Sequence, residues 1–292
     1  MRPIVHLLGA LLLAHAASAQ SIQSNIPYVE QGHARHVLDI HHAAEPTAGK
    51  PVVFWIHGGG WQTGDKTDVR IKPDWFASKG FVFVACNYRL LPDVDMETLT
   101  RDVAKAAGWV RKNIRQFGGN PERILIGGHS AGAQLAALLC TDQSYLNAEG
   151  ISLSHLLGCL PVDGDTYDIP AIIETAETRR RVHHQPQATF GHREKFGRTP
   201  ENHHRFSAVT HVKPNKNIPP FLILYVGNHP DNAAQATRLA AVLKDSQVPV
   251  SLFAAKDTDH VKLNNLLGTP NDPATAAVEG FLTSLPKPAV PR

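Results

Sequence analysis

The sequence predicts an α/β fold with a mostly parallel central sheet covered by helices on both faces. Three observations lead to this prediction. The chain has 292 residues, of which 42% are hydrophobic, and this is enough for one large core. Short apolar runs of strand length alternate with segments of helical periodicity. Most of these runs are continuously apolar, which is typical of parallel strands buried on both faces.

The predicted elements follow in order along the chain. Residues 27–45 are expected to form an N-terminal hairpin. Strands are expected at 52–56, 81–86, 124–126, 156–162, 221–226 and 250–254. Helices are expected at 96–116, 131–139, 170–182, 233–243 and 274–283. In the first of these helices, apolar residues recur at helical spacing, as at Leu99, Val103 and Val110.

The most informative motif is Gly128-His129-Ser130-Ala131-Gly132, a G-x-S-x-G pattern between a predicted strand and a predicted helix. A serine on such a sharp turn projects its hydroxyl into the open, and the turn requires glycines because neighbouring backbone approaches closely. Ser130 also precedes a helix, where free N–H groups can hold developing negative charge. The motif therefore predicts Ser130 as the nucleophile of an acyl transfer.

A second glycine-rich motif, His57-Gly58-Gly59-Gly60-Trp61, follows the apolar run 51–56. A loop after a central strand is where backbone donors for an oxyanion are expected. We predict that the N–H groups of Gly59, Gly60 and Ala131 form this oxyanion hole, each donor being worth about 3 kcal/mol in a dry site. The alternative is an ordinary tight turn, for which consecutive glycines are common.

Together these two motifs resemble the α/β-hydrolase carboxylesterases, in the branch near hormone-sensitive-lipase-like and bacterial feruloyl-esterase-like enzymes. Two other segments agree: Asn87-Tyr88-Arg89-Leu90 at the end of a strand, and residues 118–124 before the serine strand. The resemblance runs from about Pro51 to the C-terminus. It implies the α/β-hydrolase fold and serine hydrolysis, and it does not specify a substrate.

In that fold the catalytic triad follows the order Ser, then Asp or Glu, then His. His260 is the last histidine of the chain and lies in a polar loop after the predicted strand, so it is the expected base. Asp231 is the only carboxylate in the loop after the strand 221–226, and we expect it to orient His260.

The assignment of the acid leaves an alternative open. Counting back from Gln235 places the usual acid position of the family on Asn228, whose amide would not stabilise an imidazolium cation. Asp257 and Asp259 are also carboxylates, but they lie too near His260 in sequence to reach its ring easily.

The ends of the chain suggest its processing. Residues 1–19 resemble a secretory signal, with Arg2, an apolar stretch at 4–13 and the small-residue cleavage pattern Ala17-Ser18-Ala19. The apolar stretch is too short to span a membrane. We therefore expect export, either to the periplasm or out of the cell. The remainder is expected to form one hydrolase domain (20–285), with a small cap at about 164–214 and a disordered tail (286–292).

Composition excludes other classes. A formal net charge of +3 is too small for a nucleic-acid footprint. Cys86 is expected in the core, and whether Cys140 and Cys159 pair is left open. No metal-binding cysteine spacing is present, and adjacent histidines do not share a face, so neither a metal nor a cofactor is expected.

These observations predict an exported serine esterase that cleaves small-molecule carboxylic esters through an acyl-enzyme. The alternatives are an amidase or formamidase with the same triad, or a non-catalytic hydrolase scaffold that binds a ligand. The small cap favours short acyl chains or an ester of a bulky alcohol, such as an aromatic or carbohydrate ester. Trp61 is expected to pack under the cap. The sequence does not predict the oligomeric state.

Overall fold

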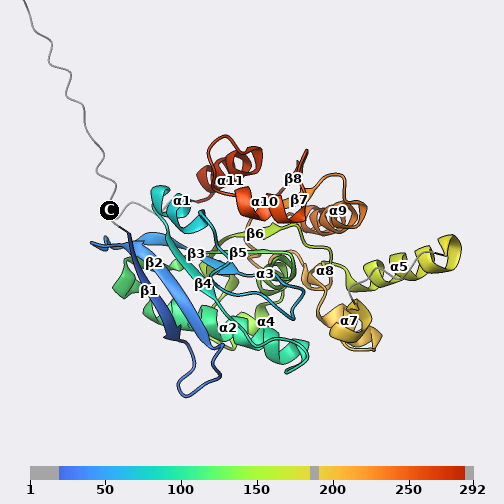
Figure 1. The fold of residues 1–292 in the computed structure, drawn as a ribbon, viewed down its shortest axis with the longest axis horizontal. Coiled ribbons are helices and arrows are strands. Elements are labelled where there is room, and N and C mark those ends of the chain that lie inside the picture. Colours follow the sequence, from blue (N-terminus) through green and yellow to red (C-terminus); the bar gives the residue numbers. More distant parts are fainter. Residues whose placement is uncertain (1–19, 185–190, 287–292) are drawn as a thin grey trace, which may run out of the picture.

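The computed structural model describes residues 20–184 and 191–286, and within them eight strands form one sheet. The strand order is β1-β2-β4-β3-β5-β6-β7-β8 (Figure 1). The bounds are β1 (Gln20–Pro27), β2 (Val37–Ala43), β3 (Lys50–Ile56), β4 (Val82–Cys86), β5 (Gly119–His129), β6 (Leu156–Val162), β7 (Phe221–Val226) and β8 (Val250–Ala255). The pairs β1–β2 and β2–β4 are antiparallel, and the other neighbours are parallel.

Helices cover both faces of this sheet (Figure 1). Their bounds are α1 (Lys72–Ser78), α2 (Met96–Asn113), α3 (Ala131–Thr141), α4 (Gln143–Asn147), α5 (Ile169–His183), α6 (His192–Lys195), α7 (Pro200–Arg205), α8 (Ala208–His211), α9 (Pro230–Asp245), α10 (His260–Leu266) and α11 (Pro273–Ser284), with 3-10 turns η1 (Ile114–Phe117) and η2 (Leu153–His155). Strand β3 shows why both faces are covered, because its successive side chains point to opposite faces of the sheet. Phe54 packs into a hydrophobic cluster on one face, and Trp55 packs into a second cluster on the other. The predicted fold class is therefore confirmed.

The differences from the sequence-based elements have local causes. The hairpin begins at Gln20 rather than at 27, because β1 is a largely exposed edge strand without an apolar pattern. The short helices α1, α4, α6, α7, α8 and α10 were not predicted, because a helix of one or two turns carries too few residues for a periodic signal. His260, expected in a loop, is the first residue of α10.

The turn between β5 and α3 consists of Ser130 alone, with φ 57° and ψ −119°. A positive φ is uncommon for a residue with a side chain. Here the surrounding contacts impose it: the Ser130 N–H donates to the Val162 carbonyl oxygen of β6 at 2.9 Å. A Cβ atom on Gly132 would lie 2.1 Å from the Ile56 carbonyl oxygen of β3, and one on Gly128 would lie 2.4 Å from the Gly132 oxygen. Both glycines of the motif are thus required by close backbone packing.

We therefore expect Gly132→Ala to destabilise the fold by roughly 3 kcal/mol or more, because the added methyl group collides with the backbone of a central strand. Urea unfolding would measure this loss. Gly280→Ala is the matched control: Gly280 is in α11 with open space around it, so the same change should stabilise by about 0.5–1 kcal/mol. Equal unfolding midpoints for the two variants would contradict the packing argument.

Candidate active site

A cavity of about 460 Å³ lies at the carboxyl ends of the central strands. The position is the one at which parallel α/β sheets bind ligands. The cavity is lined by Gly59, Gly60, Trp61, His129, Ser130, Ala131, Asp163, Asp165, His192, His229, Asn232 and His260. The structure thus brings together the predicted nucleophile, the predicted base and the three predicted oxyanion donors. It does not bring Asp231 to them.

The carboxylate that contacts His260 belongs to Asp163, the residue directly after β6. Its Oδ2 atom lies 2.6 Å from His260 Nδ1, and its Oδ1 atom accepts the Val226 N–H at 2.9 Å. Asp163 is buried and has φ 54°. Burial opposes its ionisation, but the hydrogen bonds from His260 and Val226 outweigh this and hold the pKa of the carboxyl below its usual value. Asp163 is therefore a buried carboxylate fixed at two points.

The contact with Asp163 determines which nitrogen of His260 carries hydrogen. A carboxylate only accepts hydrogen bonds, so Nδ1 donates, and in the neutral imidazole Nε2 carries the lone pair. His129 contacts both the backbone and the ring of His260: its Nε2 is 3.0 Å from the His260 carbonyl oxygen, and the centres of the two rings are 4.4 Å apart. Burial and the neighbouring His260 lower the pKa of His129 to about 3, so His129 is a neutral donor. His260 can therefore accept a proton at Nε2.

The structure contradicts the expectation that Asp231 orients His260. Asp231 lies in the first turn of α9, and its two oxygens accept hydrogen bonds from Arg179 of α5 at 2.7 and 2.5 Å. The Arg179 hydrogen bonds are the main cause of the lowered pKa of Asp231. The alternatives also lie elsewhere: Asn228 and Asp257 are exposed, and Asp259 caps the N-terminus of α10.

The sequence does contain a signal for Asp163. The apolar run 156–162 was predicted as a strand, and Asp163 is the first carboxylate after it. Asp163 also satisfies the chain order of nucleophile, acid and base. The sequence alone does not say whether the end of β6 or the end of β7 faces the histidine.

The oxyanion loop presents free donors to the cavity. Gly59 and Gly60 have φ values of 104° and 59°, and the Gly59 carbonyl oxygen accepts hydrogen bonds from the N–H groups of Gln62 and Thr63. The N–H groups of Gly59, Gly60 and Ala131 donate to no protein group in residues 20–184 and 191–286. In the same part of the chain, Ser130 Oγ forms no hydrogen bond with His260; a contact between nucleophile and base commonly tightens when substrate binds.

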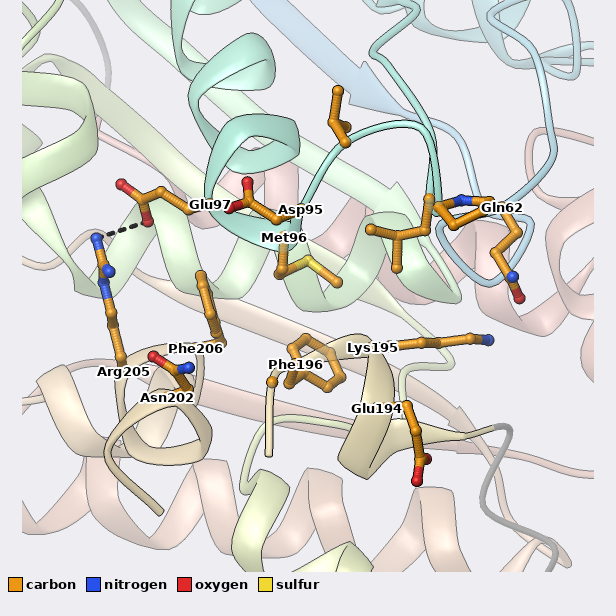
Figure 2. A pocket seen from close by; sticks show the side chains of 14 residues that line it. Gln62, Asp95, Met96, Glu97, Glu194, Lys195, Phe196, Asn202, Arg205 and Phe206 are labelled. Carbon is orange, nitrogen blue, oxygen red and sulfur yellow. Dashed lines mark ion pairs between the residues drawn. The ribbon is translucent and has the colours of Figure 1, made fainter. Parts of the chain in front are cut away.

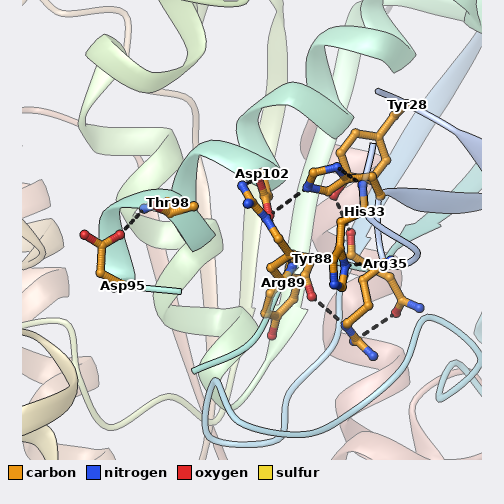
Figure 3. Close-up of polar contacts among 10 residues, drawn as sticks. Tyr28, His33, Arg35, Tyr88, Arg89, Asp95, Thr98 and Asp102 are labelled. Carbon is orange, nitrogen blue, oxygen red and sulfur yellow. Dashed lines mark hydrogen bonds and ion pairs between the residues drawn. The ribbon is translucent and has the colours of Figure 1, made fainter. Parts of the chain in front are cut away.

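The base of the oxyanion loop is held by the Asn87-Tyr88-Arg89 segment and by Arg35. The Tyr88 hydroxyl donates to the His57 carbonyl oxygen at 2.9 Å, and the His57 ring stacks on the Tyr88 ring at 4.3 Å. Arg35 donates to the Tyr88 and Gly64 carbonyl oxygens at 2.7 and 2.8 Å. Figure 3 shows Arg35 beside Tyr88, and Arg89 reaching a fully buried Asp102. These residues thus support the site without lining it.

Trp61 packs under the cap, as expected, and forms a wall of the cavity. Its Nε1 donates to the side chain of Gln134 at 3.2 Å, and its ring meets that of Phe196 at 4.9 Å. A second cavity of about 420 Å³ adjoins the same two segments, since Gln62 and Phe196 both line it. Figure 2 shows this second cavity between the start of α2 and cap residues of α6 and α7, with the ion pair of Glu97 and Arg205 at its rim.

Three further observations concern cysteines, metal ligands and membrane-spanning helices in the described residues. Cys86, Cys140 and Cys159 are buried free thiols, so the pairing left open above is not formed in this structure. In residues 20–184 and 191–286, no three His, Cys, Asp or Glu side chains are grouped to hold a metal ion. A search of the same residues finds no helix with the length and apolar character needed to cross a membrane.

Comparison with known proteins identifies the family. Residues 38–241 match the family model described as BD-FAE, which covers more than half of the chain. The chain belongs to the BD-FAE family. A probable carboxylic ester hydrolase of Mycobacterium tuberculosis, LipM, is 30% identical over 276 residues, covering 89% of this chain and 61% of LipM. The esterase LipQ of the same organism is 27% identical, covering 81% of this chain and 56% of LipQ. The chain thus spans only about three fifths of the length of these relatives.

Solved structures confirm the α/β-hydrolase fold of this BD-FAE family member. Esterase B from Lactobacillus rhamnosis superposes with a TM-score of 0.71 at 21% identity, covering 90% of this chain and 84% of that protein. A truncated carbohydrate esterase from gut microbiota superposes with a TM-score of 0.69 at 20% identity, covering 92% and 97%. The resemblance to α/β-hydrolase carboxylesterases is therefore confirmed for family and fold.

The lowered pKa of Asp163 predicts an acid-dependent contribution to stability. A carboxyl with a lowered folded-state pKa stabilises the fold fully above its usual value of 3.8, and the contribution is lost as pH falls through the folded-state pKa. We expect Asp163→Asn to be less stable than the natural protein by roughly 2 kcal/mol at pH 6. This gap should close as the pH falls below the usual pKa. Thermal unfolding between pH 3 and 7 would measure it, with the exposed Asp257→Asn as control. A gap that is constant with pH would contradict the proposed ionisation of Asp163.

Proposed function

We propose that this BD-FAE family member is a serine hydrolase that cleaves small-molecule carboxylic esters. One observation carries the proposal: a single cavity contains Ser130 on a strained turn, His260 bonded to a buried carboxylate, and free backbone donors. The printed names of LipM and LipQ support ester hydrolysis as the reaction. Among the structural neighbours, esterase B was solved with an inhibitor, and a Thermogutta esterase was solved phosphoramylated by tabun.

The residues act in the following order. Ser130 turns its hydroxyl towards His260 Nε2, gives up its proton and attacks the ester carbonyl carbon. The N–H groups of Gly59, Gly60 and Ala131 stabilise the oxyanion. His260 then protonates the leaving alcohol, which leaves an acyl group on Ser130. Water, activated by His260, hydrolyses this acyl-enzyme and restores Ser130.

Asp163 acts as the acid of the triad in this proposal. It holds the Nδ1–H tautomer of His260 and stabilises the imidazolium that forms when Nε2 takes the serine proton. An amide at the acid position, as Asn228 would provide, was the reason to consider a non-catalytic scaffold. The carboxylate of Asp163 beside His260 removes that reason. Asp231, bonded to Arg179, joins α9 to the cap helix α5 instead.

The substrate class is proposed from the space around the serine. The segment between β6 and β7 contains α5 and the short helices α6 to α8, and the described cavity beside Ser130 is moderate in size. We propose short acyl chains, or an ester of a bulky alcohol that extends towards the second cavity beyond Trp61. Ester rather than amide cleavage rests on the names of the relatives. We also propose export through the signal at residues 1–19, which lie outside the described residues.

Substitution of the two aspartates separates their roles. Asp163→Asn should lower kcat/KM for p-nitrophenyl acetate by roughly 10³–10⁴-fold, because the amide favours the wrong tautomer and cannot stabilise the cation. Asp231→Asn is the matched control and should stay within about threefold of the natural protein, since it changes a partly buried ion pair that does not contact His260. Fluorophosphonate labelling should be lost in Ser130→Ala. An equal loss of activity in both aspartate variants would refute the assignment of Asp163.

The proposed acyl preference is tested with p-nitrophenyl esters of increasing chain length. We expect kcat/KM to be highest for acetate to butyrate and to fall about tenfold or more by palmitate, because the proposed site fits a short acyl chain and leaves much of a long chain in water. A clear preference for long-chain triglycerides would contradict this substrate class while leaving the serine mechanism intact.

A further inference from the structure

Lys72, the first residue of α1, has an unusual environment for a lysine. Its side chain is fully buried, its Nζ donates to the Asn264 carbonyl oxygen at 2.6 Å, and the same atom lies 5.2 Å from the centre of the Trp55 ring. Within residues 20–184 and 191–286, no carboxylate lies within ion-pair distance of Nζ. Burial, with a smaller contribution from Arg70, lowers the pKa of Lys72 to about 7.

Such a group is costly to the fold. An ammonium group removed from water needs a partner of opposite charge, and here the charged or titratable neighbours are Arg70 and the neutral His129. An apolar side chain of similar length would fill the same space without this penalty. A buried lysine without a carboxylate partner lowers stability, and a residue that does so in the interior points to a functional requirement.

The requirement is found in α10, the helix that Lys72 contacts. This helix has seven residues, begins with His260, and has Leu263 as its only buried residue. The side chain of His260 is itself 43% exposed, so burial does not fix its position. The place of the histidine therefore depends on polar contacts that hold the helix.

Polar groups hold α10 at both of its ends. At the first turn, Asp259 caps the N–H groups of Val261 and Lys262, and His129 donates to the His260 carbonyl oxygen. At the last turn, Lys72 donates to Asn264, where a cation also complements the negative end of the helix dipole. The shortest of these contacts is the one made by Lys72.

We propose that Lys72 is a positioning residue for the ester hydrolysis proposed above: by holding the C-terminal turn of α10, it keeps His260 in register with Ser130 and Asp163. It touches neither the substrate nor the reacting atoms. This inference rests on the proposed function, because it assigns a role to Lys72 through His260.

Lys72→Met tests the proposal in the full-length protein. The variant keeps most of the length of the unbranched side chain and removes the donor. We expect kcat for p-nitrophenyl acetate to fall about tenfold with KM within twofold, while the melting temperature at pH 6 stays equal or rises. Lys79→Met is the matched control, because Lys79 is the C-cap residue of the same helix and its partly exposed side chain pairs with Glu279; it should leave kcat unchanged.

Lys72→Gln provides a rescue. Its amide can donate to a carbonyl oxygen without carrying charge, so kcat should recover to within about threefold of the natural protein. Unchanged kcat in Lys72→Met would overturn the proposal. So would losses in the Met and Gln variants that simply follow a loss of folded protein, measured by circular dichroism.

A readout without turnover separates this inference from the proposed function. The Nδ1–H proton of His260 that faces Asp163 should give a downfield proton NMR signal in the natural protein, and Asp163→Asn should abolish it. In Lys72→Met we expect this signal to broaden or exchange faster, and an identical signal would refute the positioning role. If the natural protein hydrolyses no ester, the proposed function fails, whereas the NMR comparison still decides whether Lys72 positions His260.

Discussion

The close packing of α3 on β3 is the constraint on which the rest of the site depends. Gly132 allows the helix backbone to rest on the Ile56 carbonyl oxygen, and β3 ends at that residue. The oxyanion loop starts at the next position, and a Cβ atom on Gly58 would lie 3.1 Å from the Cβ of Ser130. One backbone contact therefore sets the serine, the first helical N–H and the glycine loop beside one another.

The groups around the serine are held in two different ways. The glycine loop and Asp163 are tied to the ends of central strands, through Tyr88 and His57 in one case and through Val226 in the other. His260 belongs instead to a short outer helix whose place depends on hydrogen bonds to carbonyl oxygens. The histidine is thus the member of the site with the least support from the hydrophobic core, and its supports are correspondingly polar.

The sequence predicted the parts of the site whose geometry is local. Gly128 and Gly132 flank the serine because backbone packs against them, so the motif carries its own structural reason. Asp163 has no such signature, because several strands end near a carboxylate and only the tertiary fold shows which one meets the histidine. Asp231 was favoured as the only carboxylate in its loop, but Arg179, on a distant helix, binds it.

The fold class was also predicted from patterns that are local in the sequence. Strands buried on both faces are visible as continuous apolar runs, whereas β1 and the cap helices α6 to α8 depend on contacts that a single sequence does not show. The glycine loop lies beside the serine because β3 and β5 are neighbours in the sheet. The alternation of strands and helices in the sequence already restricted the possible strand orders to a few.

The position of Asp163 directly after β6 has a consequence for how this architecture can diversify. The strand that carries Asp163 is the immediate neighbour of the strand that carries Ser130, whereas the first turn of α9 is joined to the cap through Asp231 and Arg179. In the proposed mechanism, proton transfer depends on Asp163, whereas the contact between α9 and α5 depends on Asp231. An insertion, deletion or exchange in the segment between β6 and β7 would then alter the entrance to the cavity without altering the groups to which the proposal assigns the chemistry.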